Sequence, residues 1–228
     1  MAGKRMDVDL TAKVQKVLEN ADRYHQRFYE LKKFTGPSLY FHRKALCLAG
    51  PLRTEERTDS IYAVLVSWGM HRMGGRGSKM CAYEEFRDSM QAIKSDLTKV
   101  KNRSTQTMQE TDWIALARVF AGIRIMQTKT SIVGHSKVMA HLLPDLIAPI
   151  DRQYTFKFIF GNTHITNNIE NEWRLLRKIH EKFFYPIVQD SGFKKQAARW
   201  MTDQDKYPWD TSILKIVDNL VIGAAKKG

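Results

Sequence analysis

Cysteine and long apolar runs are scarce in this sequence. Its 228 residues include two cysteines, Cys47 and Cys81, which are too few for a disulfide scaffold or a cysteine-ligated zinc site. Because thiols stay reduced in the cytosol, we expect a cytoplasmic protein. No run approaches the ~18 uncharged apolar residues of a membrane helix. The basic start of the sequence lacks the apolar segment of a signal peptide, so we expect no membrane association.

Several catalytic and nucleotide-binding motifs are also missing. The sequence has no glycine-rich phosphate loop that ends in Gly-Lys-Ser/Thr, no dinucleotide-binding Gly-x-Gly-x-x-Gly and no Gly-x-Ser-x-Gly nucleophile motif. Its seven histidines show no spacing that pairs them with cysteines or carboxylates. We therefore expect neither a metal nor a cofactor.

Acidic residues are outnumbered, 24 against 37 Lys and Arg, which gives a net charge of +13 at pH 7. Such an excess favours a polyanionic partner, with nucleic acid ahead of an anionic membrane surface. Ser60–Tyr83 and Trp113–Pro144 contain no acidic residue but several basic ones, which is typical of surfaces that face phosphates. Basicity that serves only solubility is the alternative.

Hydrophobic periodicity is helical almost throughout, and we find neither sustained alternation nor a hairpin signal. The sequence predicts an all-α protein, one unit over residues 1–228, in which two interlocked lobes share the helices. The helices are expected at 10–34, 60–72, 83–100, 112–128, 136–143, 151–160, 168–189, 192–201 and 211–225, with a less regular stretch at 39–48.

Residues 131–160 are the most informative segment. Ile132-Val133-Gly134-His135-Ser136-Lys137 predicts a turn followed by a short helix that begins at Ser136. The free backbone N–H groups of Gly134, His135 and Ser136, together with the positive helix end, would bind a DNA phosphate. An ordinary glycine turn with Ser136 as the helix N-cap is the alternative.

Asp151 follows the apolar loop Leu142–Ile150 and precedes a predicted helix at Arg152–Phe160. Its simplest role is the N-cap of that helix. A carboxylate held there beside a bound DNA phosphate can also face the sugar. Cleavage of an N-glycosidic bond develops positive charge on the sugar, which a fixed carboxylate stabilises while it orients the attacking water.

Ile132–Asp151 resembles the helix-hairpin-helix superfamily of DNA glycosylases, in which a glycine-containing hairpin precedes an essential aspartate. Gly134 and Lys137 fit the hairpin, and Asp151 fits the catalytic aspartate. The usual Pro-Gly-Val-Gly is replaced by Ile-Val-Gly-His, and the four-cysteine cluster of some members is absent. The resemblance implies a divergent branch, such as the anti-phage glycosylases that excise glucosylated hydroxymethylcytosine.

The resemblance implies one of two roles for Lys137. In bifunctional members the hairpin lysine forms a Schiff base with the sugar and nicks the strand. In monofunctional members this position only helps to hold DNA. Because the hairpin is altered here, we favour the second role and a monofunctional enzyme.

A base that is rotated out of the duplex needs aromatic walls and polar groups at its edge. The candidates for this base pocket are Trp68, His71, Arg72, Trp113 and Tyr154. The alternatives are core packing for the aromatic residues and a solvated helix end for His71 and Arg72. Arg76 and Lys79, in and after the Gly74–Gly77 loop, are candidates to grip DNA, unless this is only a flexible surface loop.

We therefore predict a monomeric DNA N-glycosylase that acts on duplex DNA with an extruded modified base. A non-enzymatic DNA- or RNA-binding helical protein is the first alternative, and a helical regulatory protein is the second. A pocket beside Asp151 would favour the enzyme, whereas a fully exposed helix cap without a pocket would favour a binding protein.

Overall fold

The computed structural model describes residues 9–31, 36–48, 54–72, 77–128, 130–165 and 167–225. The fold is all-α, as predicted, and this part of the chain contains no β-strand beyond isolated bridging positions such as Met80 with Met126. Within the same ranges, no helix has the length and apolarity needed to cross a membrane. Arg76 lies outside the described residues.

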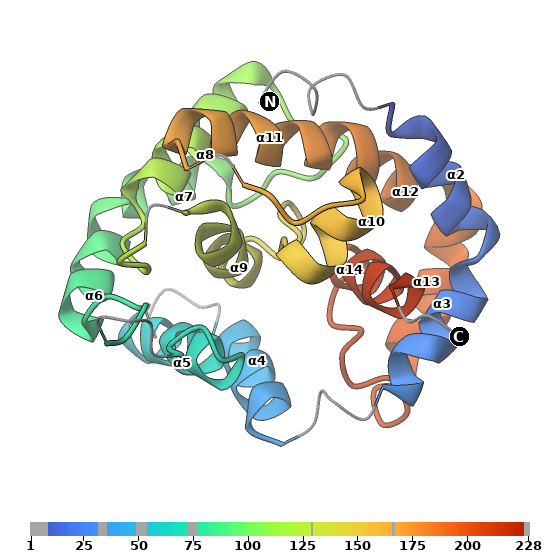
Figure 1. The fold of residues 1–228 in the computed structure, drawn as a ribbon, viewed down its shortest axis with the longest axis horizontal. Coiled ribbons are helices and arrows are strands. Elements are labelled where there is room, and N and C mark those ends of the chain that lie inside the picture. Colours follow the sequence, from blue (N-terminus) through green and yellow to red (C-terminus); the bar gives the residue numbers. More distant parts are fainter. Residues whose placement is uncertain are drawn as a thin grey trace.

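Helices from the two ends of the sequence pack together, coloured blue and red in Figure 1. Helix α14, near the C-terminal end of the sequence, packs along α3, and α12 packs on α2. This first lobe contains α2 (Thr11–Glu19), α3 (Ala21–Glu30), α12 (Tyr185–Gln189), α13 (Ser191–Thr202) and α14 (Ile213–Ala224).

The middle of the sequence forms the second lobe and the segments that join it to the first (Figure 1). The second lobe contains α4 (Pro37–Cys47), α5 (Thr54–Ser67), α6 (Tyr83–Ala92), α7 (Lys94–Val100) and α8 (Glu110–Gly122). The joining segments are α9 (Ile132–Leu142), η2 (Arg152–Phe156), α10 (Lys157–Phe160), α11 (Ile169–Ile179) and η3 (His180–Phe184). One continuous hydrophobic core runs through both lobes.

Several predicted helix boundaries are wrong for identifiable reasons. The helix predicted at 10–34 is interrupted at Asn20, whose side-chain amide donates to the Lys16 carbonyl. The stretch at 39–48, expected to be irregular, is helical up to Cys47, the last residue of α4. Gly36 has φ +71° and Pro37 is the first residue of α4, so this Gly-Pro pair begins a helix.

The helix predicted to reach Thr128 ends at Gly122. The chain after it is extended and pairs with residues 79–81: the Cys81 N–H donates to the Ile125 carbonyl, and the Gln127 N–H donates to the Lys79 carbonyl. These hydrogen bonds between the two segments replace those that another helical turn would make.

Candidate active site

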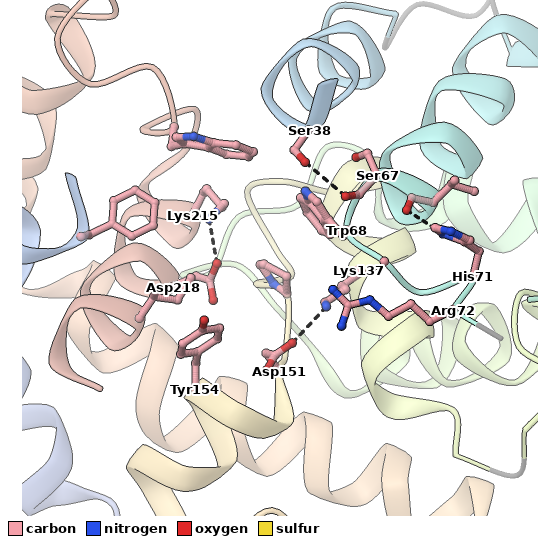
Figure 2. Close-up of a pocket in the computed structure, with 16 residues that line it drawn as sticks. Ser38, Ser67, Trp68, His71, Arg72, Lys137, Asp151, Tyr154, Lys215 and Asp218 are labelled. Carbon is pink, nitrogen blue, oxygen red and sulfur yellow. Dashed lines mark hydrogen bonds and ion pairs between the residues drawn. The ribbon is translucent and has the colours of Figure 1, made fainter. Parts of the chain in front are cut away.

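A pocket of about 550 Å³ lies between the two lobes. Residues from α3, α4, α5, α9, η2 and α14 line it, together with the loop at Pro149–Asp151. Figure 2 shows Lys137 and Asp151 on one side of this pocket and Lys215 and Asp218 on another. Two ion pairs thus line a single cavity of the size that commonly holds a small organic ligand.

Asp151 is the N-cap of the η2–α10 helix, as predicted. Its Oδ1 accepts the Gln153 N–H at 2.8 Å, and its own N–H donates to Thr155 Oγ1 at 3.1 Å. The second oxygen, Oδ2, accepts from Lys137 Nζ at 3.1 Å. Two contacts hold the carboxylate, and the side chain is 28% exposed and lines the pocket.

Residues 146–150 of the apolar loop before Asp151 are buried, and hydrogen bonds from three elements fix the loop. Ser136 Oγ on α9 accepts the Ile150 N–H at 3.0 Å, and His180 Nε2 accepts the Ala148 N–H at 2.9 Å. The Tyr185 hydroxyl donates to the Leu146 carbonyl at 2.9 Å. Because these bonds fix the loop, they also fix the position at which the Asp151 carboxylate enters the pocket.

Lys137 extends from the middle of α9, and its side chain is 12% exposed. Its ammonium group lies 5.5 Å from the centre of the Trp68 ring and 3.1 Å from Asp151 Oδ2. The ring and the carboxylate both attract the Lys137 ammonium group. The structure therefore brings Lys137 and Asp151, the lysine and the aspartate of the predicted catalytic site, into direct contact.

The predicted phosphate-binding turn at Val133–His135 is wrong. Helix α9 begins at Ile132 and continues through Gly134, His135 and Ser136, all three of which are buried. The Glu172 carboxylate of α11 accepts the N–H groups of Ser131 and Ile132 at 2.7 and 2.6 Å. An acidic side chain thus occupies the positive end of α9, where the prediction placed a DNA phosphate.

Each of the three residues has a structural role in place of the predicted contact with DNA. A β-carbon at Gly134 would lie 2.8 Å from Met126 Cγ, so glycine permits close packing there. The His135 ring N–H donates to the Phe120 carbonyl at 2.7 Å. Ser136 supports the loop that leads to Asp151. A hairpin that exposes these N–H groups is absent from this segment.

Four of the five base-pocket candidates line the cavity that holds Asp151: Trp68, His71, Arg72 and Tyr154. Trp68 and Tyr154 are half-buried, whereas His71 and Arg72 are exposed. Burial, with the nearby charges of Asp151 and Asp218, raises the pKa of Tyr154, so its hydroxyl keeps its proton. The hydroxyl points toward Asp218 in Figure 2.

Trp113, the fifth candidate, is a core residue. It is 4% exposed, and its ring lies 6.1 Å from the Trp173 ring and 5.8 Å from the Tyr185 ring, centre to centre. It does not line the pocket. The alternative of core packing therefore applies to Trp113.

The two stretches without acidic residues, Ser60–Tyr83 and Trp113–Pro144, place only some of their basic side chains at the surface. Lys79, Arg118 and Arg124 are exposed, and Arg118 already forms an ion pair with Asp96 at 3.6 Å. His135 and Lys137, from the second stretch, lie inside the molecule. The basic surface is thus smaller than the charge count of these stretches suggests.

Among the pocket-lining residues that the sequence analysis did not name are Trp209 and the α14 pair Lys215 and Asp218. Lys215 Nζ donates to Asp218 Oδ2 at 2.7 Å and lies 5.5 Å from the centre of the Trp209 ring. Burial raises the pKa of Asp218, and the Lys215 charge opposes that rise. The sequence did contain a signal for this pair: Lys215 and Asp218 stand within a mostly apolar helix, and charged residues are rarely buried there without a partner.

A buried hydrogen-bond network holds Trp209 and Lys215 in place. Asp210 is fully buried and accepts from the Tyr29 hydroxyl at 3.0 Å and from the Asn219 amide at 2.9 Å. The same amide donates to the Trp209 carbonyl at 3.2 Å. This side of the pocket is therefore rigidly connected to α3 and α14, as a preformed binding site requires.

In the described part of the chain, no group of three or more histidine, cysteine, aspartate or glutamate side chains is placed to hold a metal ion. Comparisons with models of protein families, with curated proteins and with solved structures found no match. Functional inference for this chain therefore depends on the residues of the pocket.

Proposed function

We propose that this protein is a DNA N-glycosylase that receives an extruded base in the pocket between its lobes and uses Asp151 to cleave the N-glycosidic bond. The observation that carries the proposal is the position of Asp151. Its carboxylate is fixed at a helix start, paired with Lys137, and lines a cavity of about 550 Å³ with aromatic walls. A fully exposed helix cap without a pocket would have favoured a binding protein.

Asp151 provides the charge that this reaction needs. As the bond to the base breaks, positive charge develops on the sugar, and a fixed carboxylate stabilises that charge. The same carboxylate can orient and activate the water that attacks the sugar. The bonds from Gln153 and Lys137 hold its two oxygens, so little reorganisation precedes the reaction.

Lys137 is assigned to positioning and DNA binding, and the enzyme is assigned to the monofunctional type. The contact at 3.1 Å orients the Asp151 carboxylate, and the positive charge favours an approaching phosphate. The altered hairpin sequence, Ile-Val-Gly-His in place of Pro-Gly-Val-Gly, favours this type over a lyase that forms a Schiff base.

Trp68 and Tyr154 are assigned to stack on the extruded base, and the exposed Arg72 and His71 to contact the DNA that surrounds it. Aromatic rings accept any base by stacking, so these residues explain binding without defining one substrate. The resemblance to anti-phage glycosylases adds a narrower proposal, in which the base is a modified cytosine and the role is defence against phage.

The test is excision on duplex DNAs that each carry one modified base, glucosylated hydroxymethylcytosine included, followed by alkali to cleave at abasic sites. The proposal predicts alkali-dependent strand cleavage at the modified position in at least one duplex and an intact strand without alkali. If every duplex is bound and none is cleaved, the non-enzymatic nucleic-acid-binding function replaces this one.

A further inference from the structure

Lys215 and Asp218 line the pocket although both are buried, with 7% and 4% of their surfaces exposed. Lys215 Nζ donates to Asp218 Oδ2 and to Asn219 Oδ1. An ammonium group carries three N–H bonds, so one donor remains. No described residue donates a hydrogen bond to Asp218 Oδ1, and the Tyr154 hydroxyl, which points toward Asp218, forms none with it. The pocket therefore presents an unused donor beside an unused acceptor.

Net stability is a weak explanation for this buried ion pair. Burial of two charges costs free energy that their attraction often fails to recover, and apolar replacements are often neutral or stabilising. The pair is also surrounded by apolar surfaces, since the Phe28 and Trp209 rings lie 5.6 and 5.5 Å from Nζ. Polar groups that converge in an apolar pocket are the usual source of ligand specificity.

We propose that Lys215 and Asp218 recognise the edge of the bound base, and that this edge carries a carbonyl oxygen beside a ring N–H. Lys215 donates its remaining N–H to the carbonyl oxygen, and Asp218 Oδ1 accepts the ring N–H. The inference rests on the proposed function, because it places a base in the same pocket. It assigns a specificity that the stacking residues do not provide.

The choice of a carbonyl oxygen follows from the partners that Lys215 already has. Both are oxygen atoms, and a charged donor gains most from a strong oxygen acceptor. Guanine, hypoxanthine, uracil and thymine carry the O=C–N–H edge, whereas adenine and cytosine in nucleosides do not. This assignment departs from the modified cytosine that the family resemblance implies, so the experiment must separate the two.

Two pairs of nucleosides that differ at this edge provide the test. Calorimetric titration of the intact protein with uridine and cytidine, and with inosine and adenosine, measures each Kd. We expect uridine and inosine to bind ~10-fold or more tightly than their partners, because the wrong edge leaves a buried charged group without a hydrogen bond. Equal affinities, tighter binding of cytidine, or binding of none of the four would overturn the assignment.

Variants of the pair provide a second test. Lys215→Met with Asp218→Leu removes both charges and keeps apolar volume, so the protein should remain folded. We expect this double variant to lose the preference for uridine over cytidine. Lys195→Met, at an exposed lysine of α13, should keep it. A preference that persists in the double variant would overturn the assignment.

The edge assignment and the glycosylase proposal fail in different ways. Nucleoside binding needs no excision, so a retained preference with no excision on any duplex would remove only the enzymatic function. Excision with a preference for cytidine would remove only the edge assignment and would favour a cytosine-type substrate.

Discussion

Lys137 Nζ lies 3.1 Å from Asp151 Oδ2 although the two residues belong to different elements, α9 and the N-cap of η2. The buried loop between them returns the chain to α9 through the bond from the Ile150 N–H to Ser136 Oγ. This contact joins the hairpin lysine and the aspartate that carry the resemblance to glycosylases, and it lies in a pocket with aromatic walls.

We expect DNA binding to weaken with salt. If ~5 phosphates are neutralised, log K should fall against log salt with a slope of about −4 to −5. Lys79→Ala, at an exposed lysine, should reduce the magnitude of the slope by ~0.9 without changing base preference. The same is expected for Arg76→Ala.

Fluorescence titration at several salt concentrations measures this slope, and Lys195→Ala is the matched control. A salt-independent affinity would favour the regulatory helical protein over both nucleic-acid functions.

We expect Lys137→Ala to weaken DNA binding and to leave part of the excision activity. The substitution removes a cation from the pocket and the partner of Asp151 Oδ2, while the Gln153 N–H still holds Oδ1. Single-turnover excision and a binding titration separate the two effects. Borohydride treatment of the wild-type reaction should trap no adduct. A covalent adduct through Lys137 would make the enzyme a bifunctional lyase.

Acid should destabilise the protein through three buried histidines. Burial lowers the pKa of His135, His141 and His180 from 6.5 to about 4. The folded state thus favours the neutral ring, and the stabilisation present above pH 6.5 is lost as the pH falls through about 4. The loss reaches up to ~1.4 kcal/mol for each unit of lowered pKa.

Urea unfolding between pH 6.5 and pH 4 measures this loss, and His180→Gln isolates one group. Glutamine can still accept the Ala148 N–H, so the variant should fold and lose less stability with acid than the wild type. Parallel curves for the two proteins would remove His180 from this explanation.

Substitutions of Trp68 and Trp113 should have different effects, because Trp68 lines the pocket and Trp113 lies in the core. Trp68→Leu should slow single-turnover excision by ~10-fold or more, because base–aromatic stacking contributes ~1–3 kcal/mol. Trp113→Leu should lower the free energy of unfolding by ~2 kcal/mol or more and keep the excision rate of the folded protein. Denaturant unfolding and excision kinetics of both variants measure these effects. Equal losses of excision rate in the two variants would contradict the prediction.

The all-α class, the cap at Asp151 and four pocket residues could be predicted from sequence because they depend on local patterns. Apolar periodicity and N-cap preference act within a few residues. Such local patterns could not show that Gly134 lies within a helix and not in a turn. A glycine required by the close approach of Met126 looks the same in sequence as a glycine required by a turn.

Long-range partners account for what the sequence could not reveal. Glu172 is 40 residues from Ile132, yet it caps α9 and excludes the predicted phosphate. Lys215 and Asp218 reach the pocket only because α14 packs on α3. Periodicity places α14 in the core but does not say which cavity its polar residues line.

Single-turnover excision by Asp151→Asn is the most direct test of the account. Asparagine keeps an oxygen that can accept the Gln153 N–H, so the cost to folding should be ~1 kcal/mol or less. It removes the charge that stabilises a cationic sugar and activates water, so the excision rate should fall ~10²-fold or more. DNA binding should persist or tighten because a negative charge has left the pocket. A folded Asp151→Asn variant with near-normal excision on the same duplex would contradict the proposed mechanism.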